Sequence, residues 1–223
     1  MAAHGAESPA GATFELTAVG ANVGLGLELP AGAIAADVGP LDLSSAPGAA
    51  LALHQAWKLA DGGGLELACV HAPASRWIPG LEDAVLGAAS AMVRSHTGWG
   101  SFSPGDVRPV GGHLEQSFSL PADGPGAAAT GTGRHLLGFA GRPPQVVLCS
   151  LVCTSSASAT AADCAQVAGS VTSHGLGAAP PPGWLASALG WAARSPQLTL
   201  GAAGLCALAA VALLLRFRPR PRY

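Results

Sequence analysis

The stretch QVVLCSLVC, residues 145–153, decides the fold of this chain. It is apolar on both faces of a strand, because Val146, Leu148 and Val152 alternate with residues that are themselves apolar. A strand without a polar face is typical of the middle of a sheet, where it is covered on both sides. The sequence therefore predicts a central strand here, with residues 134–140 as its hairpin partner.

Strand patterns also occur in the first half of the chain. Alternating apolar and polar residues predict half-buried strands over 13–18, 23–29 and 112–120. Residues 51–59 and 65–70 flank the sequence ADGGG, and a glycine-rich turn of this kind is typical of a β-hairpin.

Two segments have the period of a helix instead. The first covers 78–96, with acidic residues in its first turn, basic residues in its last, and Gly98 as a stop. Its predicted apolar face consists of Leu81, Val85, Ala88 and Met92. The second helix begins at a capping pair, Thr160 and Asp163, and Gly175 closes it. Its predicted apolar face consists of Cys164, Val167, Ala168 and Val171.

Strands and helices thus come in separate blocks over residues 13–175, without βαβ alternation. The predicted class is α+β, a largely antiparallel β-sheet with two flanking helices. This element order, together with LELPAG at 27–32, resembles the PsbP-like α/β fold, which includes the bacterial LpqN- and DcrB-type domains. The resemblance implies an accessory or binding protein, and it supplies no catalytic residues.

The C-terminal part of the chain predicts a transmembrane helix over 197–215. The eighteen residues from 198 to 215 carry no charge, and as a helix they span about 27 Å, close to the hydrocarbon thickness of a bilayer. Arginines in the basic tail, 216–223, end the span because charge is costly in lipid. The predicted anchor residues are Leu198, Leu205, Leu208, Val211, Leu215, Arg216, Arg218, Arg220 and Arg222.

The segments that flank the predicted domain, and the predicted span itself, are rich in small residues. Residues 1–12 are small and polar, which predicts a flexible N-terminus without the features of a secretory signal. Residues 176–196 form a Pro/Gly linker and then a short helix, in which Trp184 and Trp191 suit the membrane interface; a last helix packed on the domain is the alternative. Small residues recur in the span at Ala202, Cys206 and Ala210, a pattern that favours helix–helix association.

Charge and motifs exclude several classes of function. Residues 1–194 hold seven Lys and Arg against thirteen Asp and Glu, so nucleic acid is not an expected partner, whereas the basic tail suits a lipid bilayer. The seven histidines lack metal-ligand spacing, and no GxSxG motif is present. We therefore expect no cofactor, no metal and no catalytic residue.

The cysteines leave two interpretations open. Cys149 and Cys153 face the same side of the predicted central strand, and Cys164 lies on the core face of the next helix. Cys153 and Cys164 enclose only ten residues, so a disulfide between them is sterically allowed. The alternative, small buried hydrophobic residues in a reducing compartment, is favoured here because the N-terminus carries no export signal.

These patterns predict a non-enzymatic, single-pass, tail-anchored accessory protein of a bacterial inner membrane. One lysine against ten arginines is typical of a GC-rich bacterial genome. The expected arrangement places the domain at the cytoplasmic face, where it binds an unidentified protein partner. Two alternatives stay open. The first is a membrane-tethered hydrolase. The second is the same binding domain displayed outside the cytoplasm, which the positive-inside rule favours because the four terminal arginines would stay cytoplasmic.

Overall fold

The structure is a computed structural model that describes residues 10–20, 22–44, 46, 48–99, 101–121, 128–156 and 161–179. Its contacts divide the chain into one unit of residues 1–77 and 82–181 and another of residues 78–81 and 182–223. All described helices and strands belong to the first unit.

The described elements are ten strands, two α-helices and one short 3-10 helix. The strands are β1 (Ala10–Glu15), β2 (Gly24–Leu29), β3 (Ile34–Ala36), β4 (Ala50–Lys58), β5 (Gly64–Pro73), β6 (Ser103–Val110), β7 (His113–Leu120), β8 (Ala128–Ala140), β9 (Gln145–Ser156) and β10 (Thr172–His174). The helices are α1 (Glu82–Thr97), α2 (Ala161–Ser170) and the 3-10 helix η1 (Ala74–Arg76).

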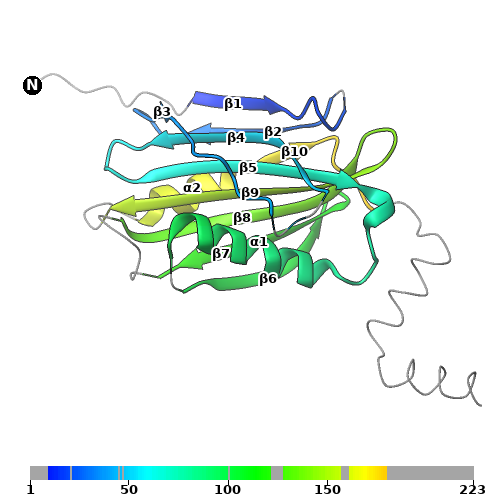
Figure 1. Cartoon of the computed structure of the whole chain (residues 1–223). Coiled ribbons are helices and arrows are strands. Elements are labelled where there is room, and N and C mark those ends of the chain that lie inside the picture. Colours follow the sequence, from blue (N-terminus) through cyan, green and yellow to red (C-terminus); the bar gives the residue numbers. More distant parts are fainter. Residues whose placement is uncertain are drawn as a thin grey trace, which may run out of the picture. The chain divides into compact units, whose positions relative to one another are not determined.

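The strands form two sheets, in which all described strand pairs are antiparallel. The larger has the order β3-β4-β5-β9-β8-β7-β6, and the smaller has the order β1-β2-β10. The predicted α+β class is confirmed. So is the central position of 145–153, since β9 is the middle strand of the larger sheet (Figure 1).

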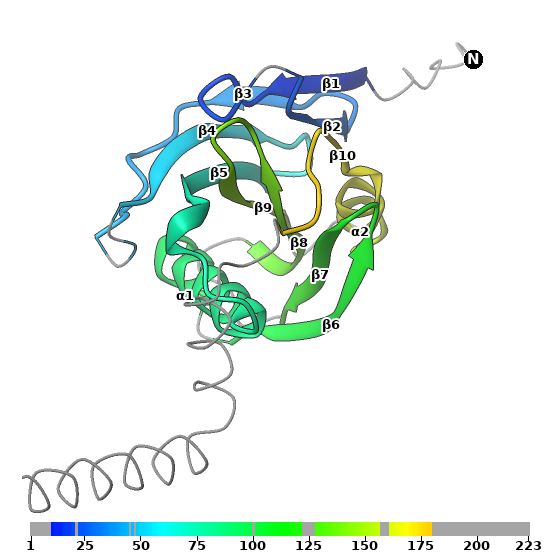
Figure 2. The same cartoon turned by 90° about the vertical axis from the view of Figure 1, so that its right-hand side faces the viewer.

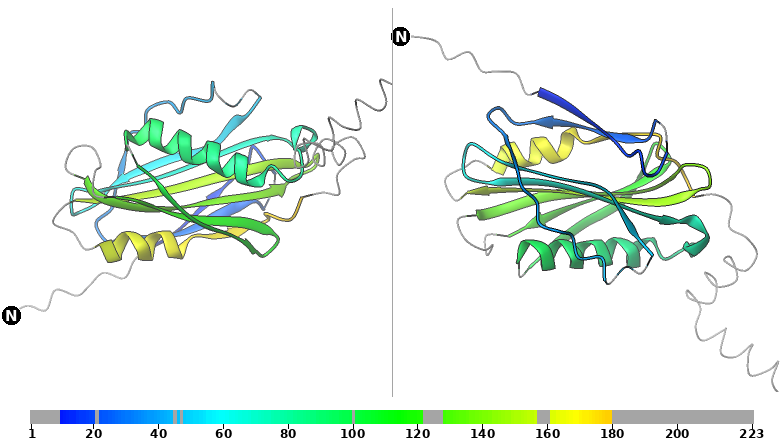
Figure 3. Two further views of the ribbon diagram at one scale, coloured as in Figure 1. Left: turned by 90° about the horizontal axis from the view of Figure 1, so that it is seen from below. Right: turned by 45° about the horizontal axis from the view of Figure 1, so that its top comes forward.

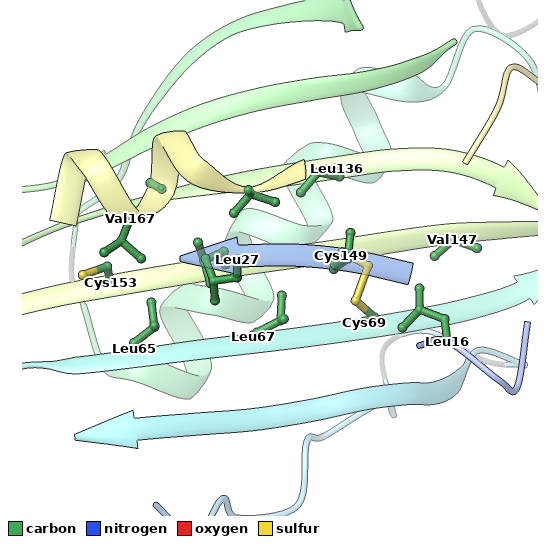
Figure 4. Packing of buried hydrophobic residues seen from close by; sticks show 14 of the residues in the cluster. Leu16, Leu27, Leu65, Leu67, Cys69, Leu136, Val147, Cys149, Cys153 and Val167 are labelled. Atoms are coloured by element: carbon green, nitrogen blue, oxygen red, sulfur yellow. A yellow bond between two sulfur atoms is a disulfide. The ribbon is translucent and has the colours of Figure 1, made fainter. Parts of the chain in front are cut away.

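The two helices cover opposite faces of the larger sheet (Figure 3). Seen along the strands, α2 lies next to β10, on the side of the smaller sheet, whereas α1 lies on the other side (Figure 2). Burial follows this layering, because side chains alternate across a strand. Val147, Cys149 and Leu151 of β9 belong to the main core, which also contains Leu27 of β2 and Val167 of α2. Figure 4 shows Val147, Cys149, Leu27 and Val167 distributed along this core.

The face beneath α1 has a smaller core, formed by Val93, Trp99, Phe118, Leu120 and Val152. The predicted apolar face of this helix, Leu81 with Val85, Ala88 and Met92, was wrong by one position. The buried residues of α1 are Leu86, Ala89, Ser90 and Val93. The sequence AVLGAASAMV is apolar or small on every side, so its period does not fix the buried face.

The other predicted helix features have mixed outcomes. The apolar face of α2 is confirmed, since Cys164, Val167 and Ala168 are buried, as is Val171, the residue that follows the helix. The stop after α1 is also confirmed: Gly98 has φ 74° and its N–H donates to the carbonyl of Arg94, an αL cap. Gly175 does not end α2, because the helix stops at Ser170 and β10 follows.

Strand boundaries depart from the prediction mainly at the sheet edges. β6 was not among the predicted strands. It contains Pro104 and Pro109, and an edge strand tolerates proline because one of its sides needs no hydrogen bonds. β3 and β10 have three residues each, too short for alternation to show. β1 begins at Ala10, inside the segment 1–12 that was predicted to be flexible.

The predicted membrane segments lie outside the described residues, as does the predicted helix cap at Thr160. These segments are the interfacial helix with Trp184 and Trp191, the span 197–215 with Ala202, Cys206 and Ala210, and the basic tail 216–223. Within the described part of the chain, no helix has the length and apolarity needed to cross a membrane.

Candidate functional site

Three polar side chains from three different elements meet on the α1 side of the larger sheet. β4 and β5 form a hairpin whose register places Ala56 opposite Glu66. His54, two residues along β4, is therefore a diagonal neighbour of Glu66 on the same face. His96 lies in the last turn of α1, the turn that reaches this part of the sheet. We call His54, Glu66 and His96 the histidine–carboxylate cluster.

Both imidazoles of the cluster contact the same carboxylate oxygen. The Nε2 atoms of His54 and His96 lie 2.7 Å and 2.9 Å from Oε1 of Glu66. All three donor atoms lie within 4.8 Å of one another, and the two rings are edge to face at 5.9 Å. The His54 side chain is only 5% exposed, whereas Glu66 and His96 are 23% and 31% exposed. The cluster is thus anchored inside the fold and open on one side.

Cavities reach the cluster from several directions. A groove of about 470 Å³ along β4 is lined by His54. Glu66 lines both a cleft of about 280 Å³, next to Trp99, and a small cavity of about 30 Å³ beneath α1. The small cavity has room for only one or two water molecules. Solvent and small ions therefore have access to the carboxylate.

The sequence did not predict this cluster. His54 and Glu66 are twelve residues apart, and the hairpin around ADGGG was the one available signal that they are neighbours. His96 is thirty positions further on, and its approach depends on how α1 crosses the sheet. The prediction that the histidines lack metal-ligand spacing was based on their positions along the chain. The cluster instead brings together residues that are distant in the sequence and close in the folded structure.

His135 forms a second polar group, entirely inside the fold. It is 0% exposed and lies between two hydroxyls: Ser90 Oγ is 3.2 Å from Nε2, and Ser150 Oγ is 2.8 Å from Nδ1. Ser90 donates its only hydroxyl proton to the carbonyl of Leu86, so Nε2–H of His135 donates to Ser90 and Nδ1 accepts from Ser150. Burial lowers the pKa of His135 to about 4. This histidine is neutral and structural.

A third group lies on the opposite face of the sheet. Glu115 bridges His113 and Arg134, with Oε1 2.9 Å from His113 Nε2 and Oε2 3.0 Å from an Arg134 nitrogen. Ser173 Oγ is 3.4–3.5 Å from both nitrogens of the His113 ring. A catalytic triad needs the serine and the acid on different imidazole nitrogens. Here Ser173 lies beside the ring and Nε2 already contacts Glu115, so the geometry of a triad is not met.

An apolar pocket of about 250 Å³ also opens on the α1 side, lined by Val70, Val85, Val146, Leu148 and Trp77 among others. His71, which lines it as well, contacts Gln145 through Nδ1 at 3.0 Å. The indole Nε1 of Trp77 is buried and has no hydrogen-bond partner within the described residues. A concave apolar surface of this size suits a small apolar ligand.

The four described cysteines form two disulfides. Cys69 of β5 lies directly opposite Cys149 of β9, with Cα atoms 4.1 Å apart. Cys153 of β9 is bonded to Cys164 of α2 across a Cα separation of 5.4 Å. The interpretation as unpaired buried thiols does not hold in this structure. The sequence placed Cys69 and Cys149 on different hairpins and gave no sign that these strands pair.

No protein-family model matches the chain, and a search of curated proteins found no match.

Proposed function

We propose that this chain is a membrane-anchored binding protein whose α+β domain is displayed outside the cytoplasm. The two disulfides carry this proposal. Disulfides persist in oxidising compartments and are rare where thiol reductants are maintained. Each pair of cysteines here has a Cα separation close to or within the range that disulfides require.

The predicted anchor is consistent with this side of the membrane. If residues 197–215 span the bilayer, the four arginines after them stay in the cytoplasm, as the positive-inside rule favours. The alternative, a cytoplasmic domain, rests on the composition of residues 1–12 alone. Two independent physical arguments therefore favour display over cytoplasmic placement.

Binding is better supported than hydrolysis. In the described part of the chain, the serine–histidine contacts are those of His135, which is sealed in the interior, and of His113, which lacks triad geometry. His54 and His71, the histidines of the β4–β5 hairpin, line different cavities and so do not share one pocket. The apolar pocket at Trp77 and the groove along β4 offer concave surfaces for a ligand or a partner. A serine hydrolase has no comparable support among the described residues.

The compartment can be tested in intact cells. Thiols are alkylated under acid quench, and the mass of the protein is compared with and without prior reduction. For a displayed domain, Cys69, Cys149, Cys153 and Cys164 become reactive only after reduction. Alkylation of all four cysteines without reductant would refute the extracytoplasmic placement.

The anchor requires a separate test. Deleting 196–223 is expected to move the protein from the membrane pellet to the soluble fraction after carbonate washing, because the apolar pattern of 13–175 forms a core without the tail. Replacing the four terminal arginines by serine, with 196–215 intact, is the matched control and should leave the protein in the pellet. A truncated chain that stays in the pellet would show that another element is the anchor.

A further inference from the structure

We propose that the histidine–carboxylate cluster binds a divalent transition-metal ion, Zn²⁺ in the first place, through Nε2 of His54, Nε2 of His96 and the carboxylate of Glu66. This site goes beyond the proposed binding function and does not depend on which side of the membrane the domain faces. Two imidazoles and one carboxylate are a ligand set that Zn²⁺ uses when a fourth position is left to water or a ligand.

The donor atoms are already gathered at nearly the required spacing. In a tetrahedral zinc site with bonds of roughly 2.0–2.1 Å, neighbouring donor atoms are about 3.3 Å apart. The two nitrogen–oxygen distances to Glu66 are 2.7 Å and 2.9 Å, and all three donors lie within 4.8 Å. Lengthening the two nitrogen–oxygen contacts by about half an ångström would bring them to this spacing. The two nitrogens, which lie within 4.8 Å of each other, would have to approach to the same spacing, and rotation of the partly exposed His96 side chain can provide this movement.

Proton balance also permits binding by neutral imidazoles. The two Nε2 atoms lie 2.7 Å and 2.9 Å from Glu66 Oε1. A carboxylate oxygen only accepts, so hydrogen bonds at these contacts require the proton of each ring on Nε2, the nitrogen that would bind the metal. On binding, each proton moves to Nδ1, and Nε2 presents its lone pair to the ion. The neutral rings lose no proton in this exchange. The carboxylate changes from hydrogen-bond acceptor to metal ligand.

The surrounding charge favours a cation. Glu66 brings a formal negative charge, and the C-terminal end of α1, where His96 lies, adds the partial negative charge of the helix dipole. His54 is nearly buried and fixes one side, whereas Glu66 and His96 face solvent in part. A water molecule can therefore complete the coordination from the open side.

The test uses the full-length protein in detergent micelles, stripped of metal with a chelator. Zn²⁺ is titrated in competition with a fluorescent chelator, and Co²⁺ is followed by the visible bands of its four-coordinate complexes. We expect one tight equivalent for the unmodified protein. Glu66→Gln and His96→Asn should each weaken Zn²⁺ binding by about 100-fold. Loss of a residue that only hydrogen-bonds a metal ligand weakens metal binding by about 10- to 100-fold, and loss of a ligand itself should weaken it at least as much.

The matched control is His174→Asn, because His174 and Glu15 form an exposed histidine–carboxylate pair at 3.4 Å on the other sheet. This variant should bind Zn²⁺ like the unmodified protein. Circular dichroism verifies that each variant is folded, and the more exposed positions 66 and 96 were chosen for this reason. Absence of a tight equivalent in the unmodified protein would overturn the proposal. So would equal Zn²⁺ affinities in the variants E66Q, H96N and H174N, since the ion would then be held elsewhere.

Discussion

Acidification from pH 7 to pH 4 is expected to destabilise the domain through one residue, the buried His135. Its ring is neutral in the fold, and both nitrogens are engaged by the hydroxyls of Ser90 and Ser150. Adding a proton at Nδ1 would convert an acceptor into a second donor facing the Ser150 hydroxyl, which would then have to turn. It would also place a charge next to the ring of Phe118, 4.6 Å away, with no counter-ion in contact among the described residues.

The magnitude follows from the difference between the pKa values of the folded and unfolded states. Burial lowers the pKa of His135 from 6.5 to about 4. Between these values the unfolded chain binds a proton that the folded chain does not, so the free energy of unfolding falls as the pH falls. The slope is about 1.4 kcal/mol per pH unit, and the loss over the whole window is about 3 kcal/mol. Above pH 6.5 this contribution is fully present.

The assay is urea denaturation followed by tryptophan fluorescence at a series of pH values, with the disulfides intact. His135→Gln is the comparison, because an amide can still pair with both serines but does not titrate in this range. Subtracting the two stability curves cancels the contributions of the other titratable groups. The difference should change by about 3 kcal/mol between pH 7 and pH 4. A constant difference would show that His135 does not titrate with a lowered pKa, and the reasoning from burial would be refuted.

Other substitutions test the core and its covalent links. Replacing both cysteines of the β5–β9 bridge by serine should lower the free energy of unfolding by about 4.5 kcal/mol, against about 3 kcal/mol for the β9–α2 bridge. The first bridge joins residues 80 positions apart and the second joins residues 11 apart, so the first closes the longer loop. Equal losses of stability in thermal denaturation would contradict the chain-entropy account. Gly133→Ala should destabilise the domain by about 1–3 kcal/mol, since a Cβ would overlap the ring of Phe118 and the backbone of Leu151. Gly87→Ala, at an exposed position of α1 with no atom near the added methyl group, should instead stabilise by about 1 kcal/mol. Leu151→Asp should unfold the domain, because this side chain is 0% exposed in the middle strand; an unchanged melting temperature would place 145–153 at an edge.

Local patterns predicted the centre of this fold better than its borders. The apolar run 145–153 has no polar face, so a central position was the one that buries it completely. The edge strand β6 carries two prolines, and its residues are largely exposed, so neither propensity nor alternation marked it. For α1 the element was right but the buried face was not, because an alanine-rich helix offers several faces of similar apolarity.

The histidine–carboxylate cluster was harder to predict from the sequence than the fold. His54 and Glu66 could be related through the hairpin turn, since the register of a two-stranded ribbon follows from its loop. His96 could not, because the angle at which a helix crosses a sheet depends on all the side chains between them. The same limit applies to Cys69 and Cys149, whose strands are neighbours in space although 80 residues separate the two cysteines.

The bridge between β5 and β9 has a consequence for proteolysis. Cys69 and Cys149 enclose a covalent ring that contains α1, β6, β7 and β8. A single cut anywhere between residues 70 and 148 opens this ring without separating the two pieces. The N-terminal strands stay tied to α2 and to the C-terminal part of the chain, so a nicked molecule would migrate as one species on a non-reducing gel. A single cut between Cys153 and Cys164 is held in the same way by the second bridge, so a single cut sheds a fragment when it falls before Cys69, between Cys149 and Cys153, or after Cys164.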